Sequence, residues 1–146
     1  MCLMKLKLHL NHKRTISTTK EKLLSYLWDL NHMPAYESKI DSIKVQPESK
    51  KNGNYKVIGR FLGSKWFGKF SYSLNPSGFH SSSLNLPSGV QVNGGFVVTT
   101  VSPEVCSLHH YEIYQLPFYM LPLYPLLKLY LAGTLRDELE VIERAV

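Results

Sequence analysis

Cysteine is scarce in this chain of 146 residues. The only two, Cys2 and Cys106, lie far apart and match neither a metal-binding nor a redox spacing. The pair gives no reason to expect a disulfide framework, so the chain must be stabilised by its core. We therefore expect a reducing, cytoplasmic location.

Long apolar runs are also missing. The N-terminus alternates lysine with leucine, unlike the continuous apolar run of a signal peptide. The most apolar stretch, residues 116–133, contains three prolines and Lys128, so we do not expect it to span a bilayer. Two interpretations stay open for its first half: packing under the edge of a sheet, or peripheral contact with an anionic membrane.

Acidic residues are absent between Glu48 and Glu104, whereas lysines are frequent there. Residues 1–70 hold 14 Lys/Arg against 5 Asp/Glu, a balance of +9 in a chain of net charge +6. Such a surface attracts an anionic membrane or an acidic protein, or it is simply the solvated side of several strands. Nucleic acid is a less favoured partner, because no exposed face with interleaved aromatic residues is evident.

No complete catalytic, nucleotide-binding or metal-binding motif occurs. Residues 63–70 come within one residue of a P-loop, but Phe70 stands where a hydroxyl should bind magnesium, and the segment continues as a strand. His109 and His110 are neighbours on a predicted strand, so they point to opposite faces and cannot chelate one ion together. We expect no cofactor and no metal.

The first secondary-structure signal is a strand followed by two short helices. Met4, Leu6, Leu8 and Leu10 alternate with polar residues, which predicts a half-buried strand. Residues 17–21 have the spacing of a capping box, with Thr18 and Glu21 as its ends, and an apolar helical stripe follows. The second helix is predicted to begin near Pro34.

Between residues 40 and 115 the pattern changes to six strands. Turn residues separate segments at about 40–46, 55–62, 65–74, 79–86, 92–101 and 107–115. Asn52-Gly53 predicts the first hairpin turn, since this pair readily supplies positive φ angles. The short connections predict antiparallel pairing of consecutive strands.

The C-terminal segment returns to helical periodicity. One apolar stripe is predicted to face a sheet, and charged residues lie mainly opposite. Its members are Leu123, Leu126, Leu127, Tyr130, Leu131, Leu135, Leu139, Ile142 and Val146. The whole pattern predicts an α+β helix-grip fold in one domain, residues 1–146: a curved antiparallel seven-stranded sheet wrapped around a long C-terminal helix, with two short helices after the first strand. A twisted sheet crossed by one helix leaves a cavity at one end.

Four stretches resemble the START/Bet v 1-like (SRPBCC) superfamily, in particular its polyketide cyclase/dehydrase and coenzyme Q-binding START-like branch. Residues 15–24 are similar to its strand-to-helix entry, residues 94–98 to its late strand, and residues 117–146 to its proline-led terminal helix. Residues 27–36 resemble its pair of short helices, although Tyr36 stands where many members carry tryptophan. The resemblance implies the fold and an apolar ligand, without choosing between carriers and enzymes.

The candidate site residues are those predicted to face this cavity. Polar residues on the apolar faces are the most informative: Arg14 on the first strand, and His110 and Glu112 on the last. A buried charge must be paired, so Arg14 and Glu112 are either partners or orient a ligand, and His110 with Glu112 forms a candidate acid–base pair. The alternative is that these residues reach solvent at strand ends. The candidate ligand-binding residues are Trp66, Phe70, Tyr72, Phe96, Val98, His110, Glu112, Tyr114, Leu127, Tyr130 and Leu131.

Three functions are consistent with these patterns. The favoured one is the binding or carriage of a hydrophobic small molecule such as a lipid, a quinone or an aromatic polyketide. The second is a polyketide cyclase or aromatase-dehydrase whose catalytic candidates are His110, Glu112 and Arg14. The third is an interaction module that uses its basic face.

Overall fold

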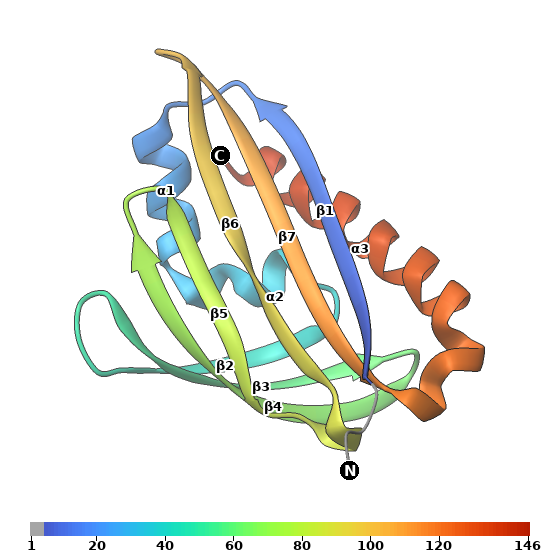
Figure 1. Ribbon diagram of the computed structural model, residues 1–146. Coiled ribbons are helices and arrows are strands. Elements are labelled where there is room, and N and C mark those ends of the chain that lie inside the picture. Colours follow the sequence, from blue (N-terminus) through green and yellow to red (C-terminus); the bar gives the residue numbers. More distant parts are fainter. Residues whose placement is uncertain (1–4) are drawn as a thin grey trace.

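The computed structural model describes residues 5–146 and contains one curved sheet of seven antiparallel strands (Figure 1). Cys2 and Met4 lie outside the described residues. The strand order is β1-β7-β6-β5-β4-β3-β2, so the first and last strands of the sequence are neighbours. The strands are β1 (Lys5–Ile16), β2 (Ile40–Pro47), β3 (Asn52–Phe61), β4 (Ser64–Asn75), β5 (Gly78–Asn85), β6 (Gln91–Ser102) and β7 (Val105–Pro117). The predicted helix-grip fold is confirmed.

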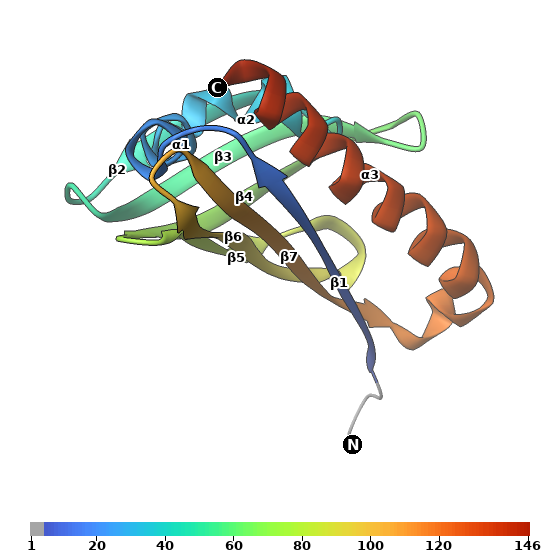
Figure 2. The same cartoon turned by 90° about the horizontal axis from the view of Figure 1, so that it is seen from above.

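The helices lie on one side of this sheet (Figure 2). Two short helices, α1 (Lys20–Trp28) and α2 (Met33–Tyr36), follow β1 and are joined by the 3₁₀ turn η1 (Leu30–His32). The long helix α3 (Tyr124–Ala145) follows the 3₁₀ segment η3 (Phe118–Leu123) and packs mainly against β1. A further 3₁₀ turn, η2 (Pro87–Gly89), joins β5 to β6. Within residues 5–146, no helix combines the length and the apolar character needed to cross a membrane.

Local sequence explains the start of each short helix, with one correction. The N-cap of α1 is Thr19, whose hydroxyl accepts a hydrogen bond from Lys22 N at 3.2 Å. The predicted cap, Thr18, is instead buried, and its carbonyl accepts from the thiol of Cys106. Pro34 lies in the first turn of α2 as predicted, where its missing N–H costs no hydrogen bond.

The first hairpin differs from the prediction at its turn. Residues 48–51 form the turn, and Asn52 and Gly53 already belong to β3, paired with β2 through Gly53 and Pro47. A Cβ on Gly53 would lie 2.5 Å from the carbonyl oxygen of Gln46. The glycine therefore permits a close approach of two backbones, and φ at this position is not positive.

Helix α3 presents a narrower apolar face than the sequence predicts. Leu123 and Leu126 were expected in the stripe, but they are 54% and 63% exposed. Both lie on the side of η3 and α3 that turns away from the sheet, and Tyr130 is only half-buried. The buried face comprises Leu127, Leu131, Thr134, Leu135, Glu138, Leu139 and Ile142. It thus includes one charged residue.

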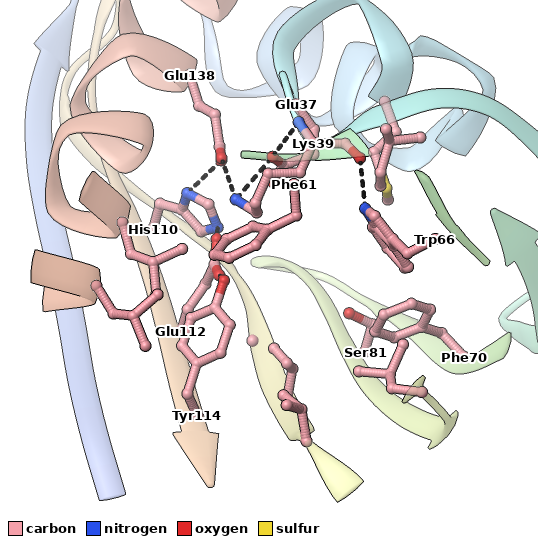
Figure 3. A pocket seen from close by; sticks show the side chains of 18 of the residues that line it. Glu37, Lys39, Phe61, Trp66, Phe70, Ser81, His110, Glu112, Tyr114 and Glu138 are labelled. Carbon is pink, nitrogen blue, oxygen red and sulfur yellow. Dashed lines mark hydrogen bonds and ion pairs between the residues drawn. The ribbon is translucent and has the colours of Figure 1, made fainter. Parts of the chain in front are cut away.

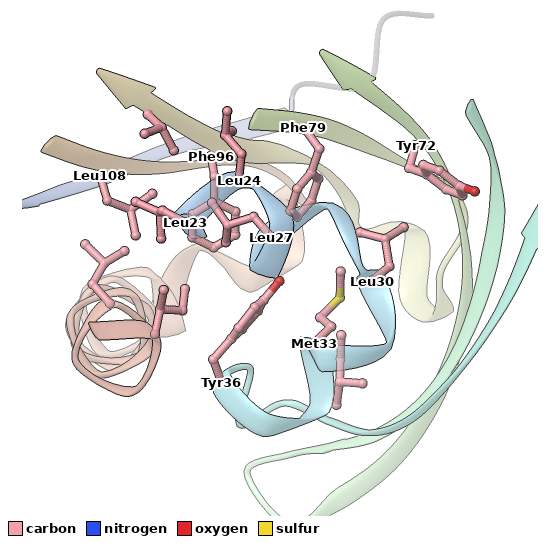
Figure 4. Packing of buried hydrophobic residues seen from close by; sticks show 14 of the residues in the cluster. Leu23, Leu24, Leu27, Leu30, Met33, Tyr36, Tyr72, Phe79, Phe96 and Leu108 are labelled. Atoms are coloured by element: carbon pink, nitrogen blue, oxygen red, sulfur yellow. The ribbon is translucent and has the colours of Figure 1, made fainter. Parts of the chain in front are cut away.

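Buried apolar residues form two clusters under the helices. The first surrounds α1 and α2 and includes Leu27, Tyr36, Phe79 and Phe96 (Figure 4). The second lies between the N-terminal half of α3 and strands β1 and β7, around residues such as Leu131. A volume between the two clusters is left unfilled.

Candidate functional site

A cavity of about 510 Å³ lies between the two clusters. Its wall takes residues from both, such as Phe70 and Phe96 from the first and Leu116 and Leu131 from the second. Most of the wall is apolar, which suits the burial of an apolar ligand. The rim is formed by the β3–β4 turn, by η2 and by Met120 of η3.

Eight of the predicted ligand-binding residues line this cavity. They are Trp66, Phe70, Phe96, His110, Glu112, Tyr114, Leu127 and Leu131. The other three lie elsewhere: Tyr72 and Val98 are buried in the first cluster, and Tyr130 packs edge-on against Phe61, with ring centroids 5.4 Å apart. The sequence thus predicted correctly which of these side chains of β4 and β6 point inward. Position along each strand then decides which inward side chains reach the cavity.

The polar part of the wall begins with strand β7. Its side chains alternate between buried and half-buried, so Leu108, His110, Glu112, Tyr114 and Leu116 all point inward. Three consecutive inward positions are therefore polar. They lie near Glu138, which reaches the same place from α3 (Figure 3).

His110 connects two carboxyl groups. Its Nδ1 lies 2.9 Å from Oε2 of Glu138, and its Nε2 lies 3.4 Å from Oε1 of Glu112. The ring stacks on Phe96, its cross-strand partner in β6, at a centroid distance of 4.1 Å. Tyr114 donates its hydroxyl hydrogen to Oε2 of Glu112. The imidazole is thus fixed in position and in orientation.

Lys39 and Glu37 complete the cluster from the segment between α2 and β2. The carbonyl of Lys39 accepts hydrogen bonds from Arg60 N and Trp66 Nε1, which holds this segment against β3 and β4. The ammonium of Lys39 lies 2.8 Å from Oε1 of Glu37 and 3.6 Å from Oε1 of Glu138. It also donates to the hydroxyl of Thr134 at 3.4 Å.

Burial and pairing shift the pKa of each of these groups. Burial would raise the pKa of Glu37, but the ammonium of Lys39 outweighs it and lowers that pKa to about 2. Burial would lower the pKa of Lys39, but Glu112 and Glu37 hold it well above its ordinary value. Lys39 and Glu37 therefore form an ion pair near neutral pH.

The pair of His110 and Glu138 holds one proton. Burial lowers the pKa of His110 to about 3, and burial raises the pKa of Glu138 well above its ordinary value. The proton therefore resides on Glu138, whose carboxyl lies 2.9 Å from Nδ1 of His110, although the two atoms are not aligned as a hydrogen bond. Moving that proton to the imidazole leaves the net charge of the pair unchanged, so the transfer requires no compensating charge.

Glu112 has only neutral donors beside it. Burial raises the pKa of its carboxyl, and the more distant Lys39 opposes this only in part. Among residues 5–146, the one basic side chain within 4.0 Å of this carboxylate is His110, which is neutral in this arrangement. The carboxyl of Glu112 can therefore either take up a proton or accept a hydrogen bond from a donor group of a ligand.

Arg14 is not part of the site, which corrects the predicted pair with Glu112. Its guanidinium donates from Nη2 to Oε1 of Glu143 at 2.9 Å and lies 3.9 Å from Glu140, both on the outer side of α3. The side chain of Arg14 does lie on the inner face of β1, as the alternation predicted. Helix α3 covers this end of the strand, however. Arg14 therefore ties β1 to the helix and does not reach the cavity.

Three residues could in principle hold a metal ion. His110, Glu112 and Glu138 each offer a ligand atom, and these atoms lie within 4.8 Å of one another. His110 uses opposite ring nitrogens toward the two carboxyls, however, and the ammonium of Lys39 faces Glu138. The three side chains therefore form a compact polar cluster that has its own internal cation.

Sequence reasoning missed Glu37, Lys39 and Glu138. A signal existed for Glu138, because it falls on the apolar stripe of the helix between Leu135 and Ile142. No pattern marks Glu37 or Lys39, which lie in an irregular segment that only the tertiary structure brings to β7.

Comparison with solved structures supports the fold. The chain is similar to TTHA0849 from Thermus thermophilus, with a TM-score of 0.81 and 15% identity over 93% of this chain and 94% of that one. It is similar to the Zhui aromatase/cyclase from Streptomyces sp. R1128, with a TM-score of 0.77 and 13% identity over 95% of each chain. It is also similar to a START superfamily protein from Mycobacterium smegmatis, with a TM-score of 0.78 and 11% identity over 94% and 96%.

These likenesses establish that the chain has the helix-grip fold, as the sequence predicted. Proteins of this fold include ligand-binding proteins and cyclases. No protein-family model matches the chain, and no curated protein sequence does either.

Proposed function

We propose that this protein binds a hydrophobic small molecule, such as a lipid, a quinone or an aromatic polyketide, in the cavity between the sheet and α3. The observation that carries the proposal is a cavity of about 510 Å³ whose largely apolar wall contains a compact polar cluster. A volume of this size is typical of small-molecule sites. The apolar wall supplies affinity, and the cluster around His110, Glu112 and Tyr114 orients the ligand.

Native mass spectrometry of freshly purified protein is the direct test. An added mass of a few hundred daltons, released by organic solvent, would support binding and identify the chemical class. If the protein is purified without ligand, its binding of the uncharged fluorescent dye N-phenyl-1-naphthylamine is measured instead. Added ligands that occupy the cavity should then displace the dye. Protein that retains no ligand and fails to bind the dye, lipids, quinones or polyketides would contradict the proposal.

A cavity-filling variant locates the binding. Leu127 lines the cavity and is 8% exposed, so Leu127→Trp should reduce dye binding by at least about ten-fold by occupying the space. Leu129 lies on the same helix and is 75% exposed, so Leu129→Trp should bind the dye like the wild type. Equal loss in both variants would place the dye outside the cavity.

A second candidate function, an enzyme of the cyclase or dehydrase type, is favoured by the close approach of Glu138 and Glu112 to the two ring nitrogens of His110, at 2.9 and 3.4 Å. In an intramolecular aldol addition, a base removes a proton from the attacking carbon and an acid donates one to the carbonyl oxygen. Glu112 can serve as the base and the protonated Glu138–His110 pair as the acid, so protons balance without a cofactor.

Turnover of a short poly-β-ketone thioester tests this second function. Liquid chromatography with mass spectrometry should detect a cyclised isomer of unchanged mass, and the product one water lighter if the new hydroxyl is then eliminated, above the uncatalysed rate. Glu112→Gln should lower the rate of cyclisation by at least about 100-fold. Glu140→Gln is the matched control, because Glu140 lies on α3 outside the cavity. A rate no higher than that without protein would contradict the enzymatic function and leave binding untouched.

Carriage requires a route into the cavity, and the rim suggests peripheral contact with an anionic membrane. Met120 and Leu127 line the cavity, while apolar neighbours on the same segments are exposed. The exposed residues are Phe118, Tyr119, Leu121, Leu123, Leu126 and Leu129. Lys65 lines the cavity at the β3–β4 turn and Lys128 is exposed on α3, and both can meet anionic headgroups.

Vesicle sedimentation tests the contact. The protein should sediment with phosphatidylcholine vesicles that contain phosphatidylglycerol, and the double variant Leu121→Ser/Leu126→Ser should lose most of this association. Phe67→Ser removes an apolar side chain that is more exposed than either leucine, from the outer face of β4, and should have no such effect. No sedimentation of the wild type would contradict membrane contact.

A further inference from the structure

The charges buried around the cavity do not cancel. The buried groups are Glu37 and Lys39 from the α2–β2 segment, His110 and Glu112 from β7, and Glu138 from α3. Tyr36, Tyr55 and Tyr114 add neutral hydroxyls from α2, β3 and β7, and Lys65 of β4 is exposed at the rim. In the interior, three carboxyl groups therefore meet one ammonium and one imidazole.

Pairing these groups leaves one carboxyl over. Lys39 and Glu37 form an ion pair at 2.8 Å, and the carboxyl of Glu138, whose pKa burial raises well above its ordinary value, lies 2.9 Å from Nδ1 of His110. Glu112 remains, with the hydroxyl of Tyr114 and the Nε2–H of His110 as neutral donors. Oε1 of Glu138 is also buried and has no hydrogen-bond partner among the described residues. A positively charged group of a ligand would balance the charge of the unpaired carboxylate of Glu112.

Strand β6 places a glycine opposite Glu112. This cross-strand partner is Gly94, where a Cβ would lie 2.8 Å from the carbonyl oxygen of Tyr111 and 3.2 Å from Cγ of Glu112, so any side chain there would crowd Glu112. Gly94 and Gly95 both line the cavity, so no side chain from this part of β6 covers the carboxyl. On the far side of Gly94, Ser81 of β5 adds one hydroxyl to the wall.

We propose that the cavity selects amphiphiles whose polar end is a protonated amine, held by the carboxylate of Glu112 next to the hydroxyl of Tyr114. The proposal rests on the proposed binding function and names its ligand class. An ammonium buried against a neutral wall would be strongly disfavoured, whereas a carboxylate partner compensates its desolvation. The same surplus of carboxyl groups disfavours ligands with a carboxylate or phosphate end, because the buried ammonium of Lys39 is already paired.

A matched ligand series separates the polar end from the apolar chain. Decylamine, 1-decanol and decanoic acid share one chain, and each can displace N-phenyl-1-naphthylamine from the wild-type protein at neutral pH. Decylamine should bind at least ten-fold more tightly than 1-decanol, equivalent to about 1.4 kcal/mol. Decanoic acid should bind at least ten-fold more weakly than 1-decanol.

Glu112→Gln tests the residue. The amide keeps the shape and a hydrogen-bonding group but cannot carry negative charge, so the variant should bind decylamine more weakly than 1-decanol while its affinity for 1-decanol stays within about three-fold of the wild type. Glu140→Gln should behave like the wild type. The comparison of ligands on the wild type does not depend on any variant folding.

Each result has a distinct meaning. Equal affinity of the wild type for decylamine and 1-decanol, or an amine preference that survives Glu112→Gln, overturns the proposed amine selectivity and leaves hydrophobic binding in place. Failure of all three ligands and of the dye to bind overturns the proposed function as well.

Discussion

The imidazole of His110 has both ring nitrogens directed at carboxyl groups from different elements. Glu138 of α3 lies at Nδ1, and Glu112 of the same strand lies at Nε2. Ordinarily two nearby carboxylates would favour imidazolium, but desolvation opposes a charged ring so strongly that the pKa of His110 falls to about 3. The proton that would have charged the ring stays on Glu138.

This balance predicts that His110 remains neutral from pH 8 down to pH 5. Long-range ¹H–¹⁵N correlation spectra should show a constant pair of ring nitrogen shifts for His110 across this interval, with one nitrogen protonated. The resonance can be assigned by its loss in His110→Gln. A titration of these shifts with a midpoint between pH 6 and 7 would contradict the prediction and would place the shared proton on the ring.

At the scale of elements, strands β2, β3 and β4 carry an unfavourable row of like charges on their outer face. Lys44 is paired across the strands with Lys56, and Lys56 with Lys69. Next to this row the exposed Ile58 and Phe67 are also cross-strand partners. The sequence predicted no exposed face with interleaved aromatic residues. Phe67 is a single exposed ring beside these lysines, and a single ring is not a stacking platform.

Lysines directly opposite each other repel, so Lys56→Glu should stabilise the protein. The glutamate would face Lys44 on one side and Lys69 on the other, and we expect a gain of about 0.5 kcal/mol in the free energy of unfolding. Urea denaturation at low salt measures it, and added salt should reduce the gain. Lys50→Glu makes the same charge change in the β2–β3 turn and should gain less. An equal gain in both variants would show that net charge alone is responsible.

Helix α3 shows how one element can serve two purposes. Its C-terminal half is buried through Leu135, Leu139 and Ile142 and stabilises the fold, whereas Leu127 and Leu131 line the cavity. Glu138 lies in the C-terminal half, between Leu135 and Leu139, and also lines the cavity. The helix therefore joins the polar cluster to the core that holds it in place.

At the scale of the whole molecule, the cavity lies between two apolar clusters that share helix α3. The C-terminal half of α3 packs in the first cluster through Leu139 and Ile142, and its N-terminal half packs in the second through Leu127 and Leu131. An apolar ligand that fills this cavity buries its own surface and contacts both clusters. Ligand binding and folding are therefore linked.

Linkage predicts that a cavity ligand raises the thermal stability, and that the gain grows with the logarithm of ligand concentration above the dissociation constant. A ligand present at 100 times its dissociation constant should add about 2.7 kcal/mol to the free energy of unfolding. Differential scanning fluorimetry over a concentration series measures the shift, and Leu127→Trp should show little of it. A midpoint that does not move at saturating ligand would contradict binding to the folded protein.

Much of the fold could be predicted because it follows from local periodicity. The alternation from Leu6 to Leu10 and from Leu108 to Leu116 determines which side of each strand is buried, and it correctly turned His110 and Glu112 inward. The hairpin at Gly53 was misplaced because a glycine that permits close backbone contact looks the same in a sequence as one that permits positive φ.

The sequence by itself determined the seven strands, the terminal helix and the polar residues of β7, since each depends on spacing within one segment. Only the tertiary structure decided which charges meet. It placed Glu37 and Lys39 beside Glu138, and it removed Arg14 to the outer side of α3. Contacts between distant segments depend on how helices cross the sheet, and the periodicity of one segment contains no information about that crossing.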